Sequence, residues 1–130
     1  MHEWRSHTAE IELAIDAEQP EDVFAEAAVA FGELVAASNE GEPASHAIAL
    51  EASDRGSLLV DWLEELIFLA DTESFVPERV EDVVLEHTSL RATVVGRRGD
   101  LEPLVKAATY HGLQFTQANE LCHARVVLDV

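Results

Sequence analysis

The sequence has very little cysteine and very little lysine. Cys122 is the one cysteine in 130 residues, so the chain cannot form an internal disulfide, which fits a reducing compartment. Lys106 is the one lysine, and eight lysines and arginines face 26 aspartates and glutamates. Autonomous nucleic-acid binding needs clustered basic residues for phosphate contacts, and the densest cluster here is the pair Arg97 and Arg98. We therefore expect no direct binding to nucleic acid.

Long hydrophobic runs are also missing. No run reaches the roughly 18 to 20 residues that span a bilayer. The opening stretch, MHEWRSHTAEIE, lacks the apolar core of a signal peptide. We therefore predict a cytosolic (cytoplasmic) protein without a membrane segment. With 48% hydrophobic residues, the chain suits a single domain, residues 1–130, with a sizeable core.

The formal net charge of −18 is the most unusual bulk property. A charge of this size destabilises the compact state through self-repulsion in dilute buffer. At molar salt the Debye length falls to about 3 Å, and most of this repulsion is screened. A halophilic source is therefore our hypothesis.

The longest stretch with apolar periodicity is residues 57–73, SLLVDWLEELIFLADTE, which contains neither proline nor glycine. On a helix its apolar side chains cover an arc of roughly 200°, about twice that of a surface helix. This width predicts a central helix buried on two sides, packed on a sheet and flanked by a second helix, with Ser53 or Asp54 as its cap. Phe68 projects from the acidic arc. Either a loop or a neighbouring helix covers it, or it is an exposed aromatic contact for a partner.

The remaining chain shows the periodicities of strands and of one more helix. Residues 4–8 read as a lead-in, and residues 96–103 read as a loop. The predicted elements are a strand at 11–15, a helix at 20–37, a strand at 46–50, a hairpin of 81–87 with 90–95, strands at 104–110 and 113–117 meeting in a turn or bulge at 111–112, and a strand at 121–130. This order predicts an α+β fold, a mainly antiparallel sheet packed against two helices.

Catalytic signatures are absent. The sequence has no Gly-rich phosphate loop, no G-x-S-x-G, no H-E-x-x-H and no cysteine pair for zinc. The six histidines lack ligand spacing. Cys122 shares a strand face with Val126 and Leu128, which favours a buried, inert thiol.

Carboxylates offer a candidate site. Glu10 starts the first predicted strand, and Asp129 and Val130 end the last one. If these strand ends meet, two side chains and the carboxylate at Val130 make a hard oxygen site that suits Ca²⁺, Mg²⁺ or Mn²⁺. The alternative is a set of solvated surface carboxylates.

Four blocks resemble the archease family in order and spacing. They are HTAEI (7–11), LLVDWLEELIFLADTE (58–73), KAATYHGL (106–113) and ARVVLDV (124–130). The resemblance covers the whole chain. It implies a non-enzymatic, metal-binding accessory protein that activates the RtcB-type tRNA-splicing RNA ligase, promoting guanylylation of the ligase and multiple turnover.

The resemblance also implies site residues. Its metal, calcium above all, is expected on Glu10, Asp129 and Val130, although the family pattern has Asp where this chain has Glu10. Lys106 and Tyr110 of KAATYH are candidate partner contacts, with Lys106 near the carboxylates. Lys106 also has a structural interpretation, as an internal counter-charge.

Two other functions stay open. One is a chaperone-like modulator of a tRNA methyltransferase, to which the family is also linked, with Phe68 as a candidate contact. The other is a metal-dependent hydrolase, which is disfavoured because no base, nucleophile or oxyanion donor can be named beside the carboxylates.

Overall fold

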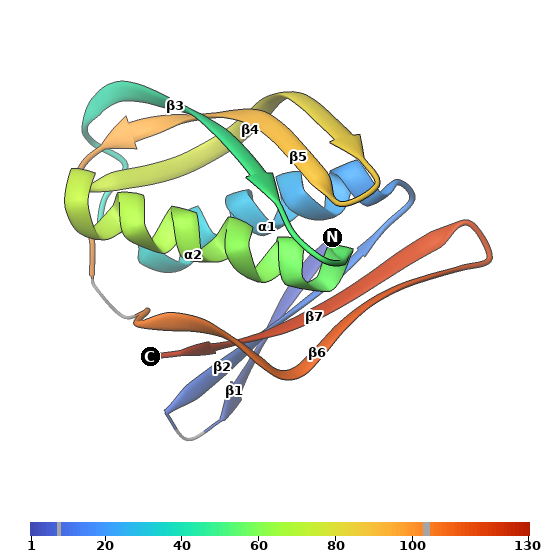
Figure 1. The fold of residues 1–130 in the computed structure, drawn as a ribbon. Helices are drawn as coiled ribbons and strands as arrows, with labels where there is room; N and C mark the ends of the chain where they lie inside the picture. The colour runs from blue at the N-terminus through green and yellow to red at the C-terminus, as the bar shows by residue number, and fades with distance from the viewer. Residues whose placement is uncertain (8, 103–104) are drawn as a thin grey trace.

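Two helices lie between two antiparallel sheets, so the chain forms three layers (Figure 1). The structure, a computed structural model, describes residues 1–7, 9–102 and 105–130. The strand order is β1-β2-β7-β6 in the four-stranded sheet and β3-β5-β4 in the three-stranded sheet. The elements are β1 (His2–His7), β2 (Glu10–Ala17), α1 (Pro20–Val35), β3 (Glu42–Glu51), α2 (Arg55–Glu73), β4 (Phe75–Glu86), β5 (Ser89–Arg98), β6 (Ala107–Ala118) and β7 (Leu121–Asp129). The predicted α+β class is confirmed.

Helix α2 is the central helix that its wide apolar arc predicts. Asp54 caps it by accepting a hydrogen bond from Ser57 N at 2.7 Å, and backbone hydrogen bonding from Ser57 lowers the pKa of Asp54. Trp62 is fully buried, and its indole N–H donates to the carbonyl of Phe24 in α1 at 2.9 Å. The arc is wide because α2 packs against α1 and against strands of both sheets. The predicted sheet and flanking helix are therefore present, together with a second sheet that was not predicted.

Phe68 is not covered by a loop or a neighbouring helix. Its exposed fraction is 56%, which makes it one of the few large hydrophobic residues at the surface of the described chain. Thr72, one turn further along α2, is also exposed, and its hydroxyl donates to the carbonyl of Phe68 at 2.8 Å. The prediction of a covering element is wrong, because this arc of α2 faces solvent between the two sheets.

Two boundaries in the three-stranded sheet differ from the predicted ones. β4 begins at Phe75 and tolerates Pro77 because it is an edge strand with a register shift after this residue. β5 continues to Arg98, so residues 96–98 belong to a strand rather than to a loop.

Arg97 is buried, donates to Glu78 at 2.7 Å and also bonds the carbonyl of Ser38. Arg97 is therefore committed to internal contacts.

The four-stranded sheet contains a strand that the sequence did not predict. The sequence predicts a lead-in at residues 4–8, of which residue 8 lies outside the described residues, but β1 spans His2–His7 and pairs with β2 along its whole length. Apart from Trp4, this segment carries no large apolar residue, so its strand pattern is weak. The pairing with β2 supplies the order that the local sequence does not.

β6 is one long, irregular strand. Its register against β7 shifts between Thr109 and Gln114, so the predicted turn or bulge is a bulge, with Gly112 at a φ of +67°. Of the predicted strand at 104–110, Leu104 lies outside the described residues and Lys106 precedes the strand. On the inner side, Ala108 N donates to Glu64 of α2 at 2.9 Å.

Alternation in β2 and β7 divides the four-stranded sheet into two faces. Leu13 and Ile15 of β2, with Val126 and Leu128 of β7, are buried toward the helices. The intervening residues, which include Glu10 and Asp129, therefore lie on the outer face. Cys122 is buried on the inner face as predicted, and burial raises the pKa of its thiol.

Candidate functional site

Glu10 and Asp129 form a directly opposed pair at one end of the four-stranded sheet. Glu10 begins β2, Asp129 ends β7, and the two residues are partners in the antiparallel register. Opposed residues in such a pair have Cβ atoms about 4.5–5.5 Å apart. Both residues are half-buried. The predicted meeting of these two carboxylates is thus present in the fold.

The backbone on both sides of Asp129 is held by hydrogen bonds. Val130 N donates to the carbonyl of Ala9 at 3.2 Å, which keeps Val130 beside the start of β2. Lys106 N donates to the carbonyl of Asp129 at 2.7 Å, and Ala107 is the partner of Asp129 in β6. Glu10, Asp129, Val130 and Lys106 are therefore brought together from three parts of the chain.

Among the side chains that the structure describes, which do not include those of Ser6 and His7, no ion pair neutralises Glu10 or Asp129. The side chain of Lys106 is exposed. Like charges directly opposite one another in a sheet are destabilising. A divalent cation with oxygen ligands would remove this repulsion, so the donor set fits a hard cation.

The set is small. Among the side chains that the structure describes, no group of three or more His, Cys, Asp and Glu is placed to hold a metal ion. Glu10 and Asp129 supply two side chains, and the predicted carboxylate at Val130 would be the third oxygen donor. Water would complete the six to eight ligands that Ca²⁺ takes.

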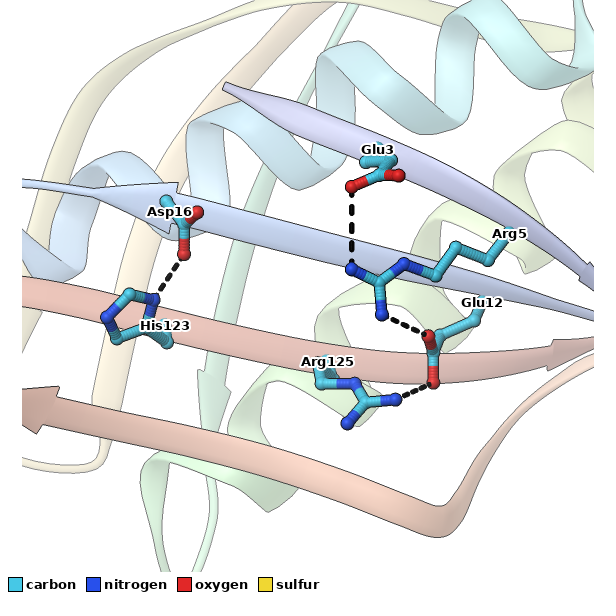
Figure 2. Close-up of polar contacts among 6 residues, drawn as sticks. All are labelled: Glu3, Arg5, Glu12, Asp16, His123 and Arg125. Carbon is cyan, nitrogen blue, oxygen red and sulfur yellow. Dashed lines mark hydrogen bonds and ion pairs between the residues drawn. The ribbon is translucent and has the colours of Figure 1, made fainter.

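Two residues further along β2, Glu12 has the opposite environment. It is 5% exposed and accepts hydrogen bonds from two arginines, Arg125 of β7 at 2.6 Å and Arg5 of β1 at 3.4 Å (Figure 2). Arg5 also contacts Glu3 at 3.5 Å. This cluster is not predicted from the sequence, where its one local signal is a glutamate within a predicted strand. Both arginines pair with Glu12, so neither of them neutralises Glu10.

A third charged group lies on the outer face, at the end of β2 that is opposite to Glu10. Asp16 is paired with the imidazole of His123 in β7, and both side chains are about half exposed. Charges on this face therefore run from the opposed carboxylates, through the Glu12 cluster, to the pair of Asp16 and His123.

A family model described as "Archease protein family (MTH1598/TM1083)" matches residues 2–130. The chain belongs to the archease family. The protein archease of Methanosarcina barkeri is 32% identical, with 99% of this chain and 95% of the relative covered. The protein archease of Pyrobaculum neutrophilum is 28% identical over the same shares.

Solved structures agree with the archease fold. Protein 1598 of Methanobacterium thermoautotrophicum, solved in solution, has a TM-score of 0.72 at 30% identity, with 99% of this chain and 98% of that chain covered. A Thermotoga maritima protein, described as an archease and possible chaperone, has a TM-score of 0.68 at 25% identity, with 100% and 98% covered. The three-layer arrangement is therefore that of known archeases.

The two aromatic candidates lie on other elements of this archease. Tyr110 is 60% exposed in the bulge of β6, four residues after Lys106. Phe68 belongs to the helix layer.

No helix in the described chain is long and apolar enough to cross a membrane.

Proposed function

We propose that this archease is a metal-binding activator of the RtcB-type tRNA-splicing RNA ligase. The observation that carries the proposal is the opposed pair of Glu10 and Asp129, held in register and outside every ion pair found among the described side chains. A protein that maintains such a repulsive pair at an accessible sheet end gains from a ligand that relieves the repulsion. The resemblance of the four sequence blocks to archeases suggests the RNA ligase as the candidate partner.

Glu10, Asp129 and the carboxylate at Val130 would hold the cation, with Ca²⁺ as first choice and Mg²⁺ or Mn²⁺ as alternatives. A bound divalent cation would supply positive charge that neutralises the two side chains and fixes this end of the sheet. Glu10 reaches one methylene further than the Asp of the family pattern. Glu10 is half-buried at the first residue of β2, and its longer side chain would adjust there to reach the cation.

Activation requires that archease bind one state of the ligase better than another, because a ligand shifts a conformational equilibrium only through differential affinity. The state favoured would be the one competent for guanylylation. Lys106 and Tyr110 would contact the ligase, because both are exposed. Lys106 is also held beside Asp129, since its backbone N–H donates to the Asp129 carbonyl. The chain itself would carry out no bond-making step.

The test is multiple-turnover ligation of tRNA halves by the cognate ligase at molar salt, with and without this protein. Asp129→Ala is expected to abolish the stimulation while leaving the fold intact. Asp16→Ala is the matched control, because it removes one carboxylate from the same sheet face at the other end of β2. Full stimulation by Asp129→Ala would refute the carboxylate pair as the working site.

A chaperone-like role toward a tRNA methyltransferase is the second candidate, and the exposure of Phe68 favours it. Binding through Phe68 would be hydrophobic and independent of metal. Phe68→Ala should then weaken binding of the methyltransferase, whereas a chelator should not. If the chelator abolishes that binding and Phe68→Ala leaves it unchanged, this second function is wrong.

A further inference from the structure

Most sheet edges in this protein are protected against pairing with another chain. β4 has register shifts after Pro77 and after Glu81, and Asp82, within the second shift, has a φ of 54°. β6 carries its bulge, and Glu64 of α2 occupies the N–H of Ala108. β1 is only six residues long and carries charged side chains. Bulges, covering helices, short length and charge are the usual means of blocking an edge.

β3 has none of these protections along most of its length. It is the other edge of the three-stranded sheet (Figure 1). Its ten residues pair with β5 without a register shift. Between Glu42 and Glu51 it carries no formal charge at neutral pH apart from any on His46. The residues on its outer face, Ser45, Ala47 and Ala49, are small and exposed. A long, flat strand of this kind is a template for strand addition.

The hydrogen-bond phase shows which backbone groups are free. Ala52 N donates to the carbonyl of Thr88, and this pair continues the register of β3 against β5 by one step. In an antiparallel ladder hydrogen-bonded pairs alternate with non-bonded ones, so the even-numbered residues of β3 bond β5. The N–H groups of Ser45, Ala47, Ala49 and Glu51 then point away from the sheet. Pro43, which has no N–H, shares this phase, as expected on an edge strand.

The glutamates at the two ends of β3 favour one kind of binding partner over another. Glu42 and Glu51 stand at the two ends of β3, and Glu40 precedes it in a chain of charge −18. A second copy paired antiparallel about Ala47, in this phase, would place Pro43 opposite Glu51 and would bring together two chains that each carry a charge of −18. A large net charge of one sign keeps chains apart, so self-pairing is disfavoured. A strand with Lys or Arg near its ends would instead form favourable cross-strand pairs.

We infer that β3 is a strand-addition site for an extended, basic segment of a partner protein. The segment adds a fourth strand beside β3 and takes the free N–H and carbonyl groups from Ser45 to Glu51. Main-chain hydrogen bonds supply the affinity, and the glutamates at the ends of β3 supply the preference for a basic segment. This surface belongs to the three-stranded sheet, whereas Glu10 and Asp129 belong to the other sheet.

The probe is a blocked eight-residue peptide of alternating Lys and Thr, with a peptide of alternating Glu and Thr as its charge control. Each is titrated into the full chain at the lowest KCl concentration at which the protein stays folded, and backbone amide spectra are followed by NMR. The Lys peptide is expected to shift the amides of Ser45, Ala47, Ala49 and Glu51 and to slow their hydrogen exchange. No binding, equal binding of the Glu peptide, or shifts confined to another strand would overturn the inference.

Variants at Ala47 test the backbone contact. Ala47→Pro removes one outward N–H and leaves the β3–β5 ladder intact, so binding should weaken about fivefold to tenfold. Ala47→Thr keeps the N–H and should bind like the parent chain. Ala47→Lys keeps the fold if the proline variant does not, and its charge should also weaken binding of the Lys peptide. Unchanged binding in a folded Ala47→Pro or Ala47→Lys variant would refute strand addition.

Sedimentation of the free chain, in low salt and in molar KCl, tests a second copy as occupant. We expect a monomer in both. A dimer that Ala47→Pro dissociates would mean that β3 pairs with itself, which would overturn the basic partner. Ligase stimulation is measured separately through Asp129, so the two proposals can fail independently.

Discussion

Glu10 and Glu12 lie two residues apart on the same face of the same strand, yet the fold treats their charges differently. Glu12 is buried between Arg5 and Arg125. Glu10 faces Asp129. A buried carboxylate must be paired to be tolerated, whereas a half-buried one can remain unpaired at a modest cost. The difference separates a carboxylate that holds strands together from one that is available to a ligand.

The largest expected effect concerns unpaired carboxylates over the whole surface. Raising KCl from low concentration to molar should increase the melting temperature, because screening removes repulsion from a net charge of −18. We expect a rise larger than the roughly 4 °C that one kcal/mol gives in a domain of this size. Thermal unfolding followed by circular dichroism measures it. Stability that is greatest at low salt would contradict both the prediction and the halophilic hypothesis.

Calcium should stabilise the protein through Glu10 and Asp129. At a free concentration one hundred times the dissociation constant, binding to the folded state alone contributes about 2.7 kcal/mol. The measurement is urea unfolding with Ca²⁺ and with a chelator. Asp129→Ala should remove the difference between the two conditions, and Asp16→Ala should retain it. An equal response of both variants would mean that calcium acts elsewhere.

Removing one of the two arginines that pair with Glu12 should lower the free energy of unfolding. Arg125→Ala leaves a carboxylate side chain that is 7% exposed with Arg5 as its one remaining partner. We expect a loss of about 2 kcal/mol, at the lower end for a buried pair because Arg125 is itself partly exposed. Arg91→Ala, which removes an exposed arginine from β5, is the control and should change the free energy of unfolding little. Equal losses would show that Glu12 does not depend on its arginines.

Glu26 of α1 is a second compensated carboxylate. Partial burial acts to raise its pKa, but hydrogen bonds from His2 and the N-terminal amine outweigh it and lower the pKa below the ordinary value of 4.5. A lowered folded-state pKa gives stability that is present above the unfolded-state pKa and is lost as pH falls through the folded-state value. The advantage of the parent chain over Glu26→Gln should therefore be full above about pH 5 and shrink below it. Glu18→Gln, at an exposed position, should show no such acid dependence in pH-dependent urea unfolding.

The smallest expected effect is a gain in stability. In the absence of metal, Asp129→Asn removes repulsion from Glu10 and should stabilise the chain by about 0.5 kcal/mol. The same substitution at Asp71, an exposed residue of α2, should give a smaller change. Chemical unfolding in the presence of a chelator measures both. Destabilisation by Asp129→Asn would mean that the carboxylate has a stabilising partner in the metal-free protein.

Local periodicity predicted the elements whose buried faces follow from the pattern of apolar residues within one short segment. The wide apolar arc of α2 predicted burial on two sides, and the alternation in β7 predicted which of its faces is buried. The position of Glu10 and Asp129 at strand ends predicted their meeting, because only the pairing of β2 with β7 was needed in addition.

The features that were missed depend on contacts between distant segments. Local patterns do not show whether strands join one sheet or two, and β1 is ordered by β2 rather than by its own residues. The Glu12 cluster combines Arg5, Glu12 and Arg125, and its longest link spans 113 positions. Such a cluster can be located only once the strand order is known.

The place of β7 constrains how the protein is made. β7 is the last strand in sequence, but it lies between β2 and β6 in the middle of the four-stranded sheet (Figure 1). Pairings of such large sequence separation form slowly, because the intervening chain must be closed into a loop first. Until residues 121–129 have left the ribosome, β2 has an open edge and β6 has no partner. The opposed carboxylates therefore assemble only at the last stage of folding, and a chain that lacks β7 would expose two strands to aggregation.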